Sequence, residues 1–291
     1  MGSVDTVPGM SGGTIAFIFG IYEELVYSVK KLTGEIPGLV LKGKLKEAVS
    51  ETPLSFLAPL GTGLAAALVT VAQIVTYLLD NQPVLIWSFF FGLLVSSIFI
   101  VKKRVVTWNS HDVGLLVASS VAAFFITGLV PLETSAAPLA FFLSGMVAIV
   151  AMILPGVSGS FFLVLLGKYE QVLDAVIGRD IVTLALVASG AAVGLAVFSR
   201  ILSWLFEKHH DIVIAGLTGL MIGSLRKLWP WQETFIPQSF DGEVFTAVIL
   251  MSAAAALMFY LDRKQATREV VADVEDPKLV KAHKKSLRLQ K

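Results

Sequence analysis

The sequence contains no cysteine, few charged residues and only four histidines. Without cysteine, the chain can form no disulfide, thiol nucleophile or thiolate metal site. Charged residues make up 15% of the chain, whereas soluble globular domains carry about 25%. The histidines (His111, His209, His210 and His283) are scattered over predicted loops and the C-terminal tail, so we expect no metal site. A net charge of +1 indicates no particular partner, and we expect no nucleic-acid partner.

Apolar residues are abundant instead. They make up 55% of the chain, and the mean hydropathy is +0.78, which predicts an all-α, multi-pass membrane protein. Gly9, Gly12 and Gly13 interrupt any early apolar core, so no cleavable signal peptide is expected. Because a membrane-crossing helix needs about 20 apolar residues, the sequence predicts several crossings. The segments predicted to cross are 54–79, 84–101, 113–130, 181–206, 212–225 and 244–261.

One motif, Pro-Gly-x-Ser-Gly, occurs twice. The first copy lies in residues 7–14 and the second in residues 154–160, 147 positions later. Proline and glycine favour a tight, irregular backbone, and serine or threonine can cap the helix that follows. Such a helix start presents free N–H groups and a positive dipole end, which suits an anion. A glycine, a tyrosine and a glutamate follow each copy at the same offset: Gly20, Tyr22 and Glu23, then Gly167, Tyr169 and Glu170.

The helices that flank the two motifs are short. The predicted helix 14–29 has only about ten apolar residues before Glu23, and segment 139–153 has about 15. Both are shorter than the roughly 20 residues of a full crossing. We therefore predict a re-entrant helical hairpin at each motif, with 161–177 as the returning arm of the second. Only six residues precede the first motif, so we expect that the first arm of its hairpin is missing.

A second internal match, at an offset of 127, extends the repeat. It pairs Gly63 with Gly190 and Gly92 with Gly219. The chain is therefore predicted to contain two homologous halves, residues 1–131 and 132–262. A basic tail at 263–291 follows the second half.

Basic residues predict the orientation of these halves. Under the positive-inside rule, segments 30–46 and 102–104 and the tail are cytoplasmic. Arg226 and Lys227 are an exception, since they fall on the outer side. Equivalent helices then run in opposite directions, which is an inverted-topology repeat of the kind found in secondary transporters.

The motifs also resemble those of a known family. Residues 5–14 and the Gly-Ile-Tyr-Glu at 20–23 are similar to the opening motif of the undecaprenyl-phosphate (polyprenyl-phosphate) translocase family, formerly a domain of unknown function. Residues 153–160 and 167–170 resemble its second motif, and the resemblance covers nearly the whole chain. It implies transport of undecaprenyl phosphate from the outer to the inner leaflet of the bacterial cytoplasmic membrane, for reuse in envelope glycan synthesis. It implies no cofactor. It leaves open the oligomeric state and the coupling ion, a proton or sodium.

Two helix starts that face each other would bind a phosphate monoester. Alternatively, the same small residues only permit helices to cross closely. The predicted binding residues in the two motifs are Ser11, Gly12, Gly13, Thr14, Ser158, Gly159 and Ser160.

Four charged residues are further candidates. Arg200 lies about 20 residues into a long apolar segment, where an unpaired charge costs several kcal/mol. It is either the counter-charge of the phosphate or a side chain that extends to the cytoplasmic surface. Glu23 and Glu170 are either coupling or gating residues, partners of Arg200, or interfacial helix ends. Lys168 is a third coupling or gating candidate, and we expect it to form a local salt bridge rather than to contact phosphate.

Two other functions remain open. A small-anion channel or exchanger could use the same facing helix starts. An intramembrane hydrolase or transferase of lipid phosphates is less consistent with the sequence, because no nucleophilic histidine, carboxylate pair or metal cluster falls in a predicted crossing. We therefore expect no enzyme and no catalytic residue.

Overall fold

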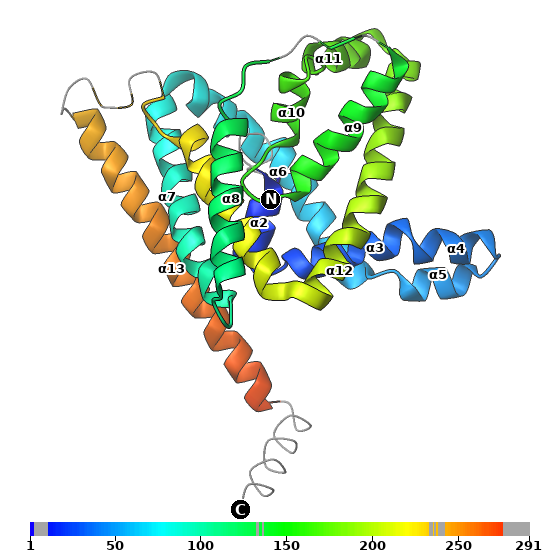
Figure 1. The fold of residues 1–291 in the computed structure, drawn as a ribbon, viewed down its shortest axis with the longest axis horizontal. Coiled ribbons are helices and arrows are strands. Elements are labelled where there is room, and N and C mark those ends of the chain that lie inside the picture. The colour runs from blue at the N-terminus through cyan, green and yellow to red at the C-terminus, as the bar shows by residue number, and fades with distance from the viewer. Residues whose placement is uncertain are drawn as a thin grey trace, which may run out of the picture.

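The computed structural model describes residues 1–2, 11–131, 134–135, 137–232, 235, 237 and 242–275, with the backbone alone for 265–275. Within this part of the chain every regular element is a helix (Figure 1). Asp5 to Met10, which include the start of the first motif, and the tail from residue 276 lie outside it.

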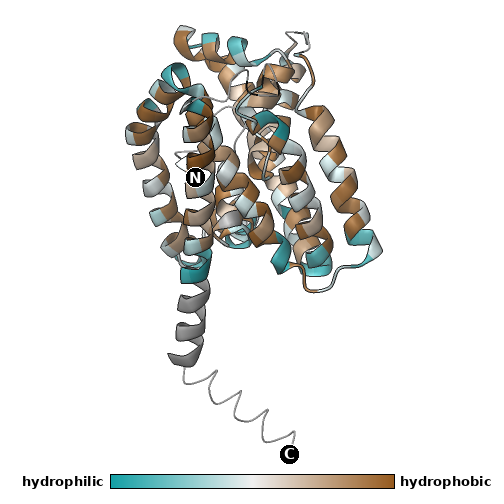
Figure 2. Cartoon of the chain, turned by 90° about the vertical axis from the view of Figure 1, so that its left-hand side faces the viewer, coloured by the Kyte–Doolittle hydropathy of each residue, from teal (hydrophilic) through white to brown (hydrophobic). Residues whose placement is uncertain are grey.

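Four of the described helices are long and apolar enough to cross a membrane: α6 (Leu54–Asn81), α7 (Pro83–Val101), α12 (Ile181–Leu228) and α13 (Gly242–Glu275). Two shorter apolar helices, α8 (Ser110–Ile126) and α9 (Pro138–Ile153), lie among them. In Figure 2, apolar residues colour the lengths of these helices and hydrophilic residues gather near their ends. The chain is thus an all-α membrane protein, as its composition predicts.

Helix α12 differs from the prediction of two separate helices at 181–206 and 212–225. It runs over 48 residues with a kink at His209, where φ is −142° and ψ is 49°. Adding 127 to the bounds of α6 and α7 gives 181–208 and 210–228, the two segments of α12 on either side of His209. Gln82, which separates α6 from α7, is the residue that matches the kink at this offset. The turn between α6 and α7 is therefore replaced by a kink at the matching position of α12.

Each motif is followed by two short helices rather than by one. These are α2 (Gly12–Ile18) and α3 (Tyr22–Thr33) after the first motif, and α10 (Gly159–Leu165) and α11 (Tyr169–Gly178) after the second. The continuous helices predicted at 14–29 and 161–177 are thus wrong. Gly20 and Gly167 adopt φ of 71° and 62°, a left-handed conformation that an α-helix cannot contain. Both breaks, like the starts of both helix pairs, are 147 positions apart.

The long helices pack closely through small residues, as membrane helices commonly do. Helix α7 packs on α13, and α12 packs on α8 and α9. A Cβ added to Gly92 of α7 would lie 2.3 Å from the Met251 carbonyl oxygen of α13. A Cβ added to its repeat partner Gly219, in α12, would lie 2.3 Å from the Leu116 oxygen of α8. In contrast, Gly63 of α6 has no neighbour within 4 Å of such a Cβ.

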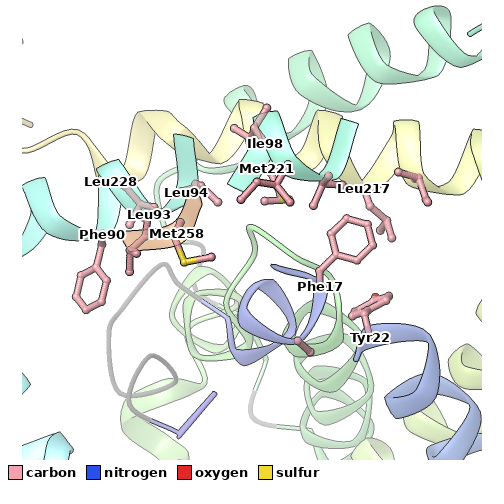
Figure 3. Packing of buried hydrophobic residues seen from close by; sticks show 14 of the residues in the cluster. Phe17, Tyr22, Phe90, Leu93, Leu94, Ile98, Leu217, Met221, Leu228 and Met258 are labelled. Atoms are coloured by element: carbon pink, nitrogen blue, oxygen red, sulfur yellow. The ribbon is translucent and has the colours of Figure 1, made fainter. Parts of the chain in front are cut away.

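A cluster of buried side chains anchors the first motif. Phe17 of α2 and Tyr22 of α3 pack edge to face, with ring centroids 5.1 Å apart, and lie against Leu217 and Met221 of α12 (Figure 3). Helix α7 contributes Leu94 to the same cluster. The short helices after the first motif are thereby held against two long ones.

The two ends of the long helices form two sides of the molecule. In Figure 1, α3, α4 (Glu35–Leu41), α5 (Leu45–Glu51) and the kink of α12 lie on the lower side. Helix α11 and the start of α13 lie on the upper side. The α4–α5 hairpin contains most of the basic segment 30–46. It is held to α3 by the 2.8 Å contact between Lys31 Nζ and Glu51 Oε2. We refer below to the lower and upper sides in this sense.

Candidate functional site

The two Pro-Gly-x-Ser-Gly motifs meet. The backbone N–H of Gly156 donates a hydrogen bond to Thr14 Oγ1 over 2.8 Å. Both groups are buried, although the residues stand 142 positions apart in the sequence. The expectation that the motifs come together is confirmed for the residues that the structure describes.

Ser11 attaches the first motif to α9. Its hydroxyl accepts a hydrogen bond from the Gly13 N–H at 3.0 Å, which caps the start of α2 as predicted. The same hydroxyl donates to the Met152 carbonyl oxygen near the end of α9. Gly13 lies so close to this end that an added Cβ would be 2.2 Å from the Ile153 oxygen. Glycine is therefore required here by the close approach of the two backbones.

The second motif is held between α2 and α12. Gly156 has φ of 83°, and an added Cβ would lie 2.7 Å from Ser224 Oγ of α12. Ser158 precedes α10 but makes no side-chain cap bond to it. Its hydroxyl instead bonds to that of Ser160 at 2.8 Å. The prediction that the serine of each motif caps the next helix therefore holds for Ser11 and is wrong for Ser158.

The motif side chains are shielded from the surroundings. Ser11 and Thr14 are each 1% exposed and Ser158 is 5% exposed. Irregular backbone at membrane depth is tolerated where it is buried in protein or lines a cavity, and here it is buried. Hydroxyls and backbone N–H groups from two distant segments thus share one polar patch among apolar helices. Gly12, Gly13 and Gly159, also predicted as binding residues, are buried as well.

Arg200 lies elsewhere. Its guanidinium Nη2 donates to the Thr33 carbonyl oxygen over 3.3 Å, at the C-terminal end of α3. This is the one hydrogen bond that the Arg200 side chain makes to a described residue, and the side chain is exposed. A cation at a helix C-terminus is favourable because the dipole is negative there. The structure thus places Arg200 at the lower side and not with the motif hydroxyls.

Lys168 is fully buried and bonded locally. Its ammonium donates to the carbonyl oxygens of Thr134 and Ser135, at 3.2 and 2.8 Å, and to Gln171 Oε1 at 3.0 Å. It also lies 4.6 Å from the centre of the Phe141 ring. All three donors of the ammonium are therefore used. The expected local role fits these contacts, although the partners are uncharged.

Glu23 and Glu170 each line a hollow at opposite sides of the molecule. The hollow at Glu23, of about 290 Å³, lies between α3 and α12 and is also lined by Glu24, Glu207 and Ser203. Ser203 Oγ is buried there with no hydrogen-bond partner among the described residues. The hollow at Glu170, of about 260 Å³, is also lined by Tyr169.

Two residues at the site could not be found from the sequence. His210, beside the α12 kink, pairs through Nε2 with Glu23 Oε1 at 3.2 Å. Ser224 is fully buried against the turn of the second motif. His210 stands in a segment predicted as a loop, and Ser224 is one of many serines in apolar helices, so no local signal marked either.

Comparison with known proteins agrees with this architecture. The profile of a family described as undecaprenyl phosphate translocase-like matches residues 1–243. A polyprenyl-phosphate transporter of Vibrio cholerae is 37% identical over 287 residues, covering 90% of this chain and 93% of the relative. A polyprenyl-phosphate transporter of Staphylococcus aureus is 28% identical over 260 residues, covering 81% and 85%. No solved structure matches the chain.

The family profile spans well over half of the chain, including both motifs and the helices that hold them together. The Vibrio cholerae relative is similar over nearly its whole length. The chain therefore belongs to the undecaprenyl phosphate translocase-like family.

Proposed function

We propose that this protein moves a polyprenyl phosphate across the bacterial cytoplasmic membrane, from the outer to the inner leaflet, and so returns the lipid carrier for envelope glycan synthesis. The observation that carries the proposal is the buried contact between Thr14 and Gly156, which joins two anion-suited motifs inside an apolar helical body. The relatives named as polyprenyl-phosphate transporters support the same cargo.

The architecture behind this function is a pair of inverted-topology repeats, residues 1–131 and 132–262, each with a re-entrant hairpin. The matching bounds of α2–α3 and α10–α11 support it. So does their arrangement, since α3 lies at the lower side and α11 at the upper side in Figure 1. In transporters of this plan, broken helices meet at the substrate site and the two repeats alternate in opening it.

The phosphate head group is bound where the motifs meet, through Ser11, Gly12, Gly13 and Thr14 from one half and Ser158, Gly159 and Ser160 from the other. In the structure these hydroxyls bond to backbone groups or to each other. Binding therefore exchanges the Thr14–Gly156 and Ser158–Ser160 bonds for bonds to phosphate oxygens. The prenyl tail stays in the lipid, because so long a chain cannot be enclosed.

The charged candidates take different roles. Arg200 bonds to one carbonyl, whereas a guanidinium has five N–H donors, so several remain for a phosphate that leaves at the lower side. Glu23 and Glu170, in hollows at the two sides, carry the coupling proton or sodium ion. Lys168 gates nothing directly; it fixes the segment before α9 to the start of α11. The lower side, with segments 30–46 and 102–104, is cytoplasmic, as is the C-terminus.

The proposal is tested in liposomes that contain the purified protein and undecaprenyl phosphate. We expect protein-dependent exposure of the phosphate on the opposite leaflet, lost in the double variant Ser11→Ala/Ser158→Ala. Chloride conductance without lipid movement would instead support an anion channel. Release of inorganic phosphate from the lipid would support a hydrolase.

A further inference from the structure

The upper side carries a basic hollow that has no assigned role. Arg226 and Lys227 end α12 there. Together with Thr127, Trp229 and Gln232 they line a space of about 170 Å³. One water molecule requires only about 10–15 Å³ of such space, so the hollow has room for a larger polar group.

The positive charge of this hollow is not neutralised by the described part of the protein. No aspartate or glutamate among the described residues lines it or lies within 4.0 Å of either cation. Arg226 donates from Nη1 to the Phe124 oxygen at 3.3 Å and lies 4.6 Å from the Phe124 ring centre. Arg226 can thus be explained as a cap on the C-terminal end of α8. Lys227 cannot, because no hydrogen bond joins its side-chain ammonium to a described residue; only its backbone oxygen accepts one, from Gln232 Nε2 at 2.6 Å.

The hollow adjoins the second motif. Lys227 Nζ lies 6.0 Å from the ring centre of Phe161 in α10, and Phe161 directly follows Ser160, a predicted phosphate ligand. The Lys227 side chain therefore lies near the start of α10, next to the second motif.

Aromatic residues place the hollow at the level of lipid head groups. Trp229 packs against Trp231, with centroids 5.4 Å apart, and against Phe91, at 5.3 Å. Tryptophan is enriched at the membrane–water interface. Arg226 and Lys227 are also the residues that break the positive-inside pattern. Two cations at an outer helix end do not help to orient the protein in the membrane, but they are explained if they bind an anionic ligand.

We propose that this hollow captures the phosphate monoester head group of a prenyl lipid at the outer surface, before the head group moves to the motifs. The inference rests on the proposed transport function and names its entry site. The Arg226 guanidinium presents a planar fork to phosphate oxygens, and Lys227 adds a second positive charge. The prenyl chain remains in the outer leaflet beside α8 and α10.

The test is binding of radiolabelled farnesyl phosphate to the full-length protein in detergent. The double variant Arg226→Gln/Lys227→Gln should bind at least about tenfold more weakly, because two charge-assisted contacts are lost. The matched control Lys103→Gln/Lys208→Gln removes the same charge from the exposed lower side and should bind like the wild type. If the first double variant does not fold, the single variant Lys227→Gln decides, since the Lys227 side chain has no hydrogen bond to a described residue to lose, and the backbone bond to Gln232 is kept.

Competition separates the two sources of phosphate. Farnesol should not displace the label, and inorganic phosphate should displace it only at far higher concentration. Equal competition by inorganic phosphate would show a free-phosphate site and overturn the assignment to lipid. Wild-type binding by Arg226→Gln/Lys227→Gln, in a preparation whose wild type transports undecaprenyl phosphate, would overturn the capture site alone. Absence of transport by the wild type would instead count against the proposed function.

Discussion

Thr14 and Gly156 are joined by a hydrogen bond between a side-chain oxygen of the first motif and a backbone N–H of the second. This bond connects the two motifs directly. It is also a bond that phosphate can replace, because a phosphate oxygen accepts from the same N–H group. In the structure, therefore, a side-chain oxygen of the first motif occupies a backbone N–H donor of the second.

The first prediction concerns this bond. Thr14→Val keeps the shape of the side chain but leaves the buried Gly156 N–H without its acceptor, which costs about 1–3 kcal/mol. We expect a lower thermal unfolding midpoint in detergent and slower transport in liposomes. Thr14→Ser retains the hydroxyl and should behave nearly like the wild type. Equal stability of the valine and serine variants would contradict the importance of the bond.

The second prediction concerns helix crossings. Gly219→Ala and Gly92→Ala each place a Cβ 2.3 Å from a carbonyl oxygen of the neighbouring helix, and overpacking of this kind costs about 1–3 kcal/mol. Both variants should unfold at lower temperature. Gly63→Ala is the matched control, because no atom lies within 4 Å of its added Cβ. It should be neutral or slightly stabilising, since alanine favours helix more than glycine. A loss of stability in the control equal to that of the other two would refute the assignment.

Lys168 provides the third prediction. Lys168→Met has a similar length but leaves two carbonyl oxygens and the Gln171 amide oxygen without a donor. Burying an ammonium group itself costs free energy, so removing it recovers part of what the three lost hydrogen bonds contributed. We expect the free energy of unfolding to fall by about 2–4 kcal/mol. Thermal unfolding measures it. Binding of farnesyl phosphate by the folded variant should be unchanged, and a selective loss of binding would instead make Lys168 a phosphate ligand.

Arg200 gives the fourth prediction. If its free donors receive the phosphate, Arg200→Gln should slow lipid transport at least about tenfold, and Arg200→Lys should restore only part of the rate because a point charge replaces a fork. Lys208→Gln, an exposed lower-side neighbour in the same helix, serves as the control. Normal transport by Arg200→Gln would show that Arg200 does not bind the phosphate and that its role is limited to the contact with Thr33 at the end of α3.

Much of the fold could be predicted from the sequence because membrane helices carry strong local signals. Apolar length indicated α6, α7 and α9 to within a few residues. The double motif indicated where the chain is irregular and which segments meet. The breaks at Gly20 and Gly167 were missed, since a glycine within an apolar segment is also compatible with a helix, and only φ reveals the left-handed turn.

The details of the site were less accessible from the sequence. The Ser158 hydroxyl can reach either α10 or Ser160, and its choice of Ser160 depends on tertiary packing. The pairing of Glu23 with His210 depends on how α3 lies against the α12 kink, which no sequence spacing encodes. Arg200 was predicted as either a phosphate ligand or a surface side chain. Its partner in the structure is the Thr33 carbonyl oxygen at the end of α3, and the sequence around Arg200 does not indicate that α3 ends beside it.

The packing of α7 against α13 has a consequence for how the protein is made. Helix α7 ends at Val101 and α13 begins at Gly242, so roughly 140 residues are synthesised between them. At about 5–20 residues per second, this takes roughly 7–28 s. During that interval the Gly92 face of α7 is in the membrane without its final neighbour. Newly inserted chains should therefore be most open to capture by insertion factors or proteases until the last helix has arrived.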